Sequence, residues 1–211
     1  MATTEQMIQA IVAQRKIEDL VHFTRLANLP SILKYGLVPR ETCRQVGIDF
    51  LHNDEHRIDG TDGISMSIGF PNYKMFYQLR VKNPTVDWVV IGINPEVLWE
   101  KSCLFCQQNA AHNDVTAIPQ RLRKLPARLD AMYCDFGSKT RASLNLPDNY
   151  PTHPQAEVIS LDLIEPKYFR GVGFKDAQLM SQVTPHPTIR FQHTPNFYFP
   201  RRDYPHWKRE N

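Results

Sequence analysis

The sequence Pro151-Thr152-His153-Pro154-Gln155-Ala156-Glu157-Val158-Ile159-Ser160 joins a stiff loop to a predicted strand. Proline fixes its own backbone and restricts the residue before it, so we expect the loop to end at Pro154. A strand pattern follows from Val158 to Ile164. Glu157 is then held at the mouth of a strand, where its carboxylate can stabilise positive charge that develops on a bound molecule. The alternative is a solvated glutamate at a strand edge, which is the commoner role of a single Glu.

The composition is that of a soluble globular protein, since 42% of the 211 residues are hydrophobic and 22% are charged. A chain of this length is expected to form one domain, residues 1–211, and to bury roughly 70% of its unfolded surface. It has no apolar run of about 18 residues, so no membrane span is expected. The start lacks a signal-peptide pattern because Glu5 and Gln6 interrupt it. We therefore expect a cytoplasmic protein.

The four cysteines allow two interpretations. Cys103 and Cys106 have the spacing of metal ligands, but the sequence has no second close pair, and His112 is the nearest histidine. A closed zinc site needs four well-placed ligands. We therefore expect no metal and reduced, unpaired thiols, with Cys43 and Cys134 completing the set.

The net charge of +3 does not by itself indicate a nucleic-acid partner, but two clusters of basic residues are notable. The second cluster is interleaved with aromatic residues, a pattern that suits the phosphates and bases of a single strand. The alternative is a solvated helix face and a packed tail. The clusters are Arg121, Arg123, Lys124 and Arg128, and then Arg201, Arg202, Lys208 and Arg209 among Tyr198, Phe199, Tyr204 and Trp207.

Apolar spacing and the placement of Pro and Gly predict an α+β fold. Asn28 is placed to cap a helix that Gly36 ends, and residues 40–63 are predicted to be a loop. The remaining tail from residue 184, rich in Pro and aromatic residues, is predicted to be extended but not featureless. Helices are predicted at 4–14, 28–36, 72–80, 95–101 and 176–182, with a helical turn at 166–169. Strands are predicted at 19–24, 64–68, 88–93, 103–106, 158–164 and 171–174.

Three polar clusters lie on strands that are far apart in sequence: His22-Phe23-Thr24, Ser65-Met66-Ser67 and Gln155-Ala156-Glu157. The common dinucleotide, phosphate-loop, serine-hydrolase and zinc-protease motifs are absent from the sequence. A lone His at a strand end is usually structural. In combination, however, the clusters resemble the ADP-ribosyltransferase fold, which implies a split β-sheet core with flanking helices.

Within that superfamily the sequence resembles the DarT family of DNA ADP-ribosyltransferase toxins. The resemblance is carried by His22-Phe23-Thr24 followed by Asn28-Leu29-Pro30-Ser31-Ile32-Leu33 and Gly36-Leu37, and by residues 131–136 and 154–158. It covers a core of about residues 17–175 and leaves an aromatic and basic extension at 184–211.

This resemblance implies an enzyme of the bacterial cytoplasm that splits NAD and attaches ADP-ribose to a base of single-stranded DNA. It implies a monomer, without a metal or a membrane, and a macrodomain antitoxin partner of the DarG type.

The resemblance also implies roles for individual residues. His22 would bind a ribose hydroxyl of NAD and Thr24 would hold the other end of the dinucleotide, because both side chains can donate and accept. Glu157 would hold the 2′-hydroxyl of the nicotinamide ribose, stabilise the oxocarbenium ion and act as a base. Tyr73, Met75 and Tyr77 would wall the nicotinamide pocket, or form the core face of a helix. Further expected cofactor contacts are Phe23, Asn28, Leu29, Ser65 and Ser67.

The family also places an arginine over the cofactor. We assign it to Arg57, with Arg44 as the alternative, as a cation that polarises the base or binds a phosphate. Lys139, Arg141, Tyr133 and His153 are the expected DNA contacts.

The middle strand departs from the thymine-modifying members of the family. The sequence Ser65-Met66-Ser67-Ile68-Gly69-Phe70-Pro71-Asn72-Tyr73-Lys74-Met75 is more similar to the guanine-modifying branch, so guanine is the expected base. Two other hypotheses are an NAD-dependent enzyme that acts on protein, RNA or water, and a non-catalytic module that binds single strands with salt-dependent affinity.

Overall fold

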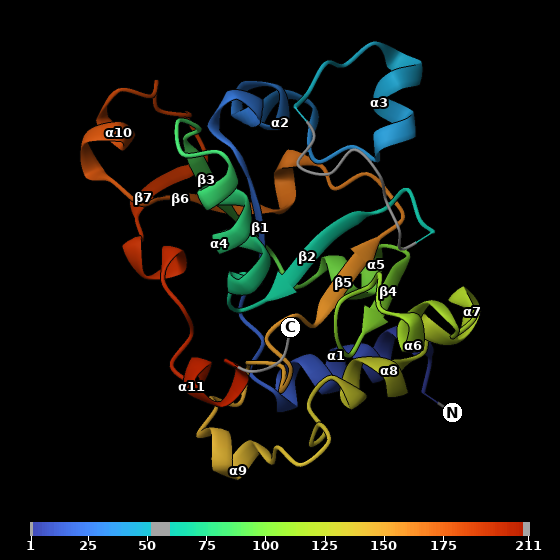
Figure 1. Ribbon diagram of the computed structural model, residues 1–211. Helices are drawn as coiled ribbons and strands as arrows, with labels where there is room; N and C mark the ends of the chain where they lie inside the picture. Colours follow the sequence, from blue (N-terminus) through green and yellow to red (C-terminus); the bar gives the residue numbers. More distant parts are fainter. Residues whose placement is uncertain (1, 52–59, 209–211) are drawn as a thin grey trace.

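The computed structural model describes residues 2–51 and 60–208 (Figure 1). In this part of the chain seven strands form one sheet, in the order β4-β5-β2-β1-β3-β6-β7. Neighbouring strands run antiparallel, apart from the parallel pair β6 and β7. The strands are β1 Leu20–Arg25, β2 Ile64–Ile68, β3 Trp88–Ile93, β4 Cys103–Cys106, β5 Glu157–Ser160, β6 Phe169–Phe174 and β7 Arg190–His193.

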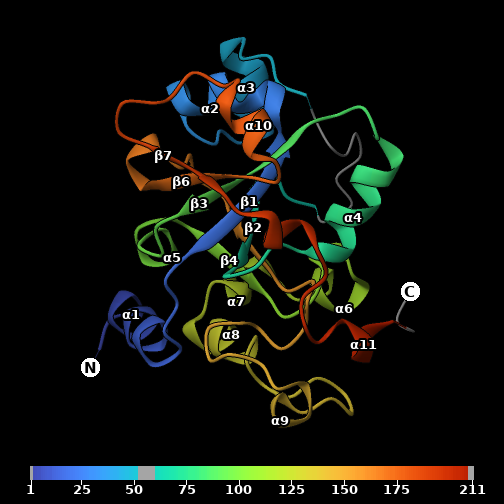
Figure 2. The same cartoon turned by 90° about the vertical axis from the view of Figure 1, so that its left-hand side faces the viewer.

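Short helices surround this sheet. Two views place α2 and α3 at one end of the molecule and α9 and α11 at the other (Figure 1, Figure 2). The helices are α1 Thr4–Gln14, α2 Leu29–Tyr35, α3 Arg40–Val46, α4 Tyr73–Lys82, α5 Val97–Glu100, α6 Asn113–Thr116, α7 Gln120–Arg123, α8 Pro126–Ala131, α9 Arg141–Leu144, α10 Ala177–Ser181 and α11 Tyr204–Trp207. Single 3-10 turns occupy Leu26–Asn28, Pro166–Tyr168 and Pro195–Tyr198.

The sheet is continuous on one side of β1 and splits on the other. β1 pairs with β3 along its whole length, from Leu20 to Arg25. Its pairing with β2 joins Leu20 to Ile68 and Val21 to Ser67. Beyond these positions the two strands separate, within the described residues, and the rest of β1 borders a cavity. The split sheet and the α+β class agree with the sequence-based expectation.

The strand and helix predictions are confirmed for most elements, and two need correction. Residues 40–46 form helix α3 instead of a loop; α3 follows Pro39 and ends at Gly47, whose φ of 70° is left-handed. The strand that starts at Glu157 ends at Ser160 rather than Ile164. There the chain turns, since the Ser160 hydroxyl donates to the carbonyl of Asp162 at 2.9 Å. The tail is not featureless, as expected, since it contributes β7 and α11.

No disulfide joins the four cysteines, all of which are among the described residues, and Cys103 and Cys106 are buried side chains of β4. Among residues 2–51 and 60–208 no group of three or more His, Cys, Asp or Glu side chains is arranged to hold a metal ion. Within the same residues no helix has the length and apolar character that crossing a membrane requires.

Candidate active site

A cavity of about 500 Å³ opens where β1 and β2 separate. Its walls come from the two strands, from α2 and α4, from the segment 37–51 that contains α3, and from the loop 109–111. Polar and apolar groups both line it, and Glu157 borders it. The residues that define the walls include Val21, His22, Thr24, Asn28, Ile32, Arg40, Ile48, Phe50, Ser65, Ser67, Asn72, Met75, Ala110 and Glu157.

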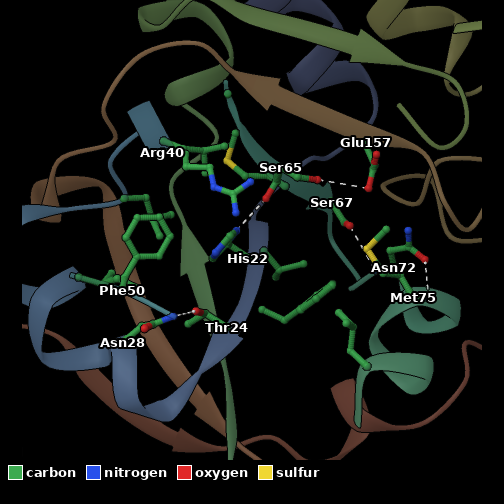
Figure 3. A pocket seen from close by; sticks show the side chains of 18 of the residues that line it. His22, Thr24, Asn28, Arg40, Phe50, Ser65, Ser67, Asn72, Met75 and Glu157 are labelled. Carbon is green, nitrogen blue, oxygen red and sulfur yellow. Dashed lines mark hydrogen bonds between the residues drawn. The ribbon is translucent and has the colours of Figure 1, made fainter. Parts of the chain in front are cut away.

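Glu157 is the first residue of β5 and is 5% exposed. Its Oε1 accepts a hydrogen bond from the Ser65 hydroxyl at 3.2 Å, and its Oε2 accepts one from the backbone N–H of Ala110 at 2.8 Å. Strand pairing with Cys106 holds its backbone. The carboxylate is therefore fixed at one end of the cavity (Figure 3).

His22 bridges the gap between the separating strands. Its Nδ1 lies 2.7 Å from the carbonyl oxygen of Ser65. A carbonyl oxygen can only accept, so Nδ1 carries the proton and Nε2 is an acceptor in the neutral ring. The imidazole is thus oriented in the cavity (Figure 3). Strand β2 lies between β1, which carries His22, and β5, which carries Glu157.

Thr24 and Asn28 are buried at another part of the cavity, 3% and 4% exposed. The Asn28 side chain does not cap α2, which corrects the sequence-based expectation. Its Nδ2 donates to the Thr24 hydroxyl at 3.1 Å and to the carbonyl of Leu51 at 2.9 Å. Its Oδ1 accepts from the backbone N–H of Leu51 at 2.8 Å. Asn28 thereby ties the end of the segment 37–51 to β1.

Helix α4 contributes one face to the cavity, at Asn72, Met75 and Leu79. These positions lie three or four residues apart and therefore share a side of the helix. Tyr73 and Tyr77 point elsewhere. Tyr73 is buried with its ring edge against Tyr204, 5.9 Å between centroids, and Tyr77 is 60% exposed. Of the three expected nicotinamide-pocket residues, the cavity wall includes Met75.

Three of the remaining expected cofactor contacts hold the fold together near the site. The Ser67 hydroxyl accepts from the backbone N–H of Asn72 at 3.1 Å and so positions the start of α4. Phe23 lines the cavity, and its ring stacks on Phe76 of α4, 4.6 Å between centroids. Leu29 is 1% exposed within the main hydrophobic core.

A cation lines the cavity at Arg40, which the sequence analysis did not single out. It is the first residue of α3, and Figure 3 shows its guanidinium between Ser65 and His22. Because Arg40 falls in a stretch predicted to be a loop, no sequence pattern marked it as a cavity residue. Arg44 lies on the exposed side of α3, paired with Glu41 at 3.1 Å. Arg57 lies outside the described residues.

Arg141 holds the loop that leads to Glu157. Its guanidinium donates to the carbonyls of Tyr150 at 2.7 Å and Pro147 at 2.8 Å, and to the Thr152 hydroxyl at 3.2 Å. Arg201, from the C-terminal extension, donates to the carbonyls of Pro151 at 2.9 Å and Thr152 at 3.1 Å. The loop is therefore clamped by two guanidinium groups before the chain enters β5.

The Arg201 clamp is itself buried and paired. Arg201 and Asp203 are 7% and 2% exposed, and two N–H groups of Arg201 donate to the carboxylate of Asp203 at 2.7 and 2.5 Å. Trp207, which is fully buried, donates its indole N–H to the same carboxylate at 2.8 Å. This part of the tail is packed, whereas Phe199 remains 57% exposed.

The other expected DNA contacts also lie in this packed region. Tyr133 is 2% exposed and His153 is 6% exposed. The His153 ring lies between those of Phe136, at 4.6 Å, and Trp207, at 4.8 Å. Burial, followed by the charge of Lys74, lowers the pKa of His153 to about 3. Lys139 sits with its ammonium 4.7 Å from the centre of the Trp207 ring.

Solved structures of DarT proteins share this fold. A Thermosipho africanus DarTG in complex with ADP-ribose superposes with a TM-score of 0.61 at 17% identity, over 86% of this chain and 51% of that chain. A Thermus sp. 2.9 DarT in complex with carba-NAD+ gives 0.53 at 10% identity, over 87% and 99%. The same DarT in complex with ADP-ribosylated ssDNA gives 0.54 at 11% identity, over 87% and 97%. The present chain spans about half the length of the DarTG chain.

This chain thus has the fold of the solved DarT structures. A family model described as "ssDNA thymidine ADP-ribosyltransferase, DarT" matches residues 21–199. The chain therefore belongs to the DarT family, as its sequence motifs indicate. Among curated proteins none matches the sequence.

Proposed function

We propose that this protein cleaves NAD and transfers the ADP-ribose group to a base of single-stranded DNA. The observation that carries the proposal is the buried Glu157 carboxylate, fixed by Ser65 and Ala110 at one end of a cavity large enough for a dinucleotide. Membership of the DarT family supports the same reaction.

The reaction follows from the charges involved. The bond between C1′ of the ribose and the nicotinamide nitrogen breaks, and its electron pair stays on nicotinamide, which leaves as a neutral ring. The positive charge that develops on the ribose is stabilised by the Glu157 carboxylate, which has also bound the 2′-hydroxyl. A base nitrogen of the DNA then bonds to C1′, and its proton passes to Glu157.

The other cavity residues bind and orient NAD in this proposal. His22, whose imidazole is oriented by the contact between Nδ1 and the carbonyl of Ser65, binds a ribose hydroxyl. Arg40, whose guanidinium lies beside His22, faces the phosphates (Figure 3). Arg57 remains the sequence-based choice for the family's arginine over the cofactor, and it lies outside the described residues.

The base that accepts ADP-ribose is assigned separately from the reaction itself. The family description names thymidine, whereas the sequence from Ser65 to Met75 is more similar to the guanine-modifying branch. We propose guanine on the sequence pattern and treat thymidine as the competing outcome of the same experiment.

The test incubates the purified protein with NAD and with four oligonucleotides, each of a single base, followed by mass spectrometry. The expected result is the mass increment of one ADP-ribose on the guanine oligonucleotide. Glu157→Gln should abolish it, while Glu18→Gln, an exposed glutamate outside the cavity walls, should not. Modification of the thymine oligonucleotide would overturn the base assignment. NAD loss with no modified oligonucleotide would overturn DNA as the acceptor.

We also propose a macrodomain partner that removes the modification, since a solved DarTG chain related to this fold is about twice as long and was determined with ADP-ribose. Expression of the wild-type chain alone should stop bacterial growth, and co-expression of a macrodomain hydrolase should restore it. Normal growth of cells that accumulate the unmutated protein would contradict this part of the proposal.

A further inference from the structure

Resting on the proposed use of NAD, we infer that Phe50 stacks on the adenine base and that Asn28 is the residue that positions it. Neither role follows from the family match or from the sequence motifs. The first observation is the set of groups to which the Asn28 side chain is hydrogen-bonded. Its amide pairs with both backbone groups of Leu51, at 2.9 and 2.8 Å, and also donates to Thr24.

This arrangement fixes the residue that precedes Leu51. The hydrogen bond from the Leu51 N–H holds the peptide that joins Leu51 to Phe50, and the bond to the Leu51 carbonyl holds Leu51 from its other side. Phe50 lines the cavity, and Figure 3 shows its ring directed into it above Asn28. Asn28 thus acts on a ligand through Phe50, because its own amide groups are engaged with the protein.

The second observation is the order of groups along the cavity. Glu157 and Ser65 lie at one end, His22 and Arg40 lie in the middle, and Phe50 with Asn28 lies at the other end (Figure 3). An extended dinucleotide whose nicotinamide ribose meets Glu157 places its phosphates near Arg40 and its second base near Phe50. That base is adenine.

The third observation is the chemistry of this end of the cavity. Phe50 offers an aromatic face without a hydrogen-bonding group, and Ile32 and Ile48 add apolar surface to the cavity wall. Aromatic rings bind nucleobases by stacking, which depends on ring area more than on base identity. The site is therefore suited to a flat base held between an aromatic ring and aliphatic side chains.

The experiment measures equilibrium binding without turnover, using ADP-ribose as a probe of the adenine half and nicotinamide mononucleotide as a probe of the other half. Phe50→Leu should weaken ADP-ribose binding about tenfold or more. It should leave nicotinamide mononucleotide binding unchanged, which also shows that the cavity is folded. Phe50→Trp should restore ADP-ribose binding. Phe199→Leu, the same change at an exposed position, is the matched control.

Asn28→Leu tests the positioning role, because an apolar side chain of similar size can neither accept from the Leu51 N–H nor donate to the Leu51 carbonyl. It should reproduce the selective loss of ADP-ribose binding. The double variant with Phe50→Leu should be no weaker than Phe50→Leu alone, since both changes remove the same contact. Additive losses would mean that Asn28 binds the nucleotide directly and would overturn its assignment.

Equal weakening of both probes by Phe50→Leu, or no weakening of either, would overturn the adenine assignment. These results are independent of DNA transfer. If the oligonucleotide assay fails while ADP-ribose binding is lost selectively, the proposed acceptor is wrong and this inference stands. If transfer occurs and the probes respond alike, this inference alone is wrong.

Discussion

Ser65 illustrates how one residue serves two functional groups. Its hydroxyl donates to Glu157 at 3.2 Å, and its backbone carbonyl holds the imidazole of His22 at 2.7 Å. The first contact depends on the side chain and the second does not. Substitution of the Ser65 side chain therefore removes the contact that orients the Glu157 carboxylate and keeps the one that orients the His22 imidazole.

We expect Ser65→Ala to lower kcat about 10- to 100-fold with little change in KM for NAD, because a hydrogen bond to a charged group contributes ~1.5–3 kcal/mol. Steady-state release of nicotinamide measures both constants. Ser138→Ala, an exposed serine outside the cavity walls, is the control. An increase in KM with unchanged kcat would show that the hydroxyl binds NAD instead of orienting Glu157.

His153 makes stability depend on pH. Its pKa is lowered from 6.5 to about 3 by burial, so between these values the unfolded chain binds a proton that the folded chain does not. Its contribution to stability is fully present above about pH 6.5 and is lost as the pH falls towards 3.

The measurement is urea unfolding of the wild type and of His153→Gln at pH 7 and pH 4.5. The wild type should lose about 2 kcal/mol more than the variant over this interval, at up to ~1.4 kcal/mol per pH unit. Parallel losses in the two proteins would contradict the low pKa of the buried ring.

At the scale of elements, the C-terminal extension and the loop before β5 form one unit. Arg201 donates to two carbonyls of that loop and to Asp203, and both side chains are buried. Removing one partner of such a pair leaves the other charge buried and unpaired, which costs ~3–5 kcal/mol.

We expect Arg201→Leu to lower the free energy of unfolding by about that amount, measured by urea denaturation, while the exposed Arg202→Leu has little effect. The double variant of Arg201→Leu with Asp203→Leu should be less destabilised than Arg201→Leu alone, because no charge is left unpaired. A double variant that is as unstable as the sum of the single ones would contradict the burial of the pair.

The sequence predicts those elements whose signal is local. The strands at 64–68 and 88–93 and the helix at 4–14 follow from apolar spacing, and the structure has them at these bounds. Helix α3 was missed because its seven residues are mostly polar and its ends are marked by Pro39 and Gly47 alone. Short helices of this kind depend on tertiary packing more than on their own sequence.

The sequence predicts which polar residues at strand ends line the cavity, but it does not predict contacts between distant segments. His22, Ser65 and Glu157 share one cavity as their motifs indicate. The contacts of Arg141 with the loop at 147–152 and of His153 with Trp207 depend on how separate segments pack, so no local pattern predicts them. The role of both residues as DNA contacts stays a prediction. Phe50 belongs to no sequence motif. Its place in the cavity is recognised only in the structure, where Asn28 pairs with the neighbouring Leu51.

At the scale of the whole molecule, the walls of the cavity come from segments that are far apart in the sequence. One wall belongs to β1, another to β2 and α4, and the segment 37–51 borders both. A ligand that contacts all of these walls links them and should stabilise the folded state.

ADP-ribose at about 100 times its Kd should add ~2.7 kcal/mol to stability, which corresponds to an increase in Tm of roughly 5–10 °C for a chain of this size. Scanning fluorimetry measures the shift, and hydrogen exchange should show protection in residues 37–51 and in the loop 109–111. Protection confined to β6 and β7, which lie at the far edge of the sheet, would contradict binding in this cavity.

Under the proposed function, the buried link between Arg201 and the loop before Glu157 also determines when the protein can become active. Ribosomes make Glu157 well before they make Arg201, Asp203 and Trp207, so a growing chain carries its reactive carboxylate without the residues that secure its approach. The same holds for any proteolytic fragment that stops short of residue 201. Harmful activity should therefore appear late in biosynthesis, after the last anchoring side chain has docked.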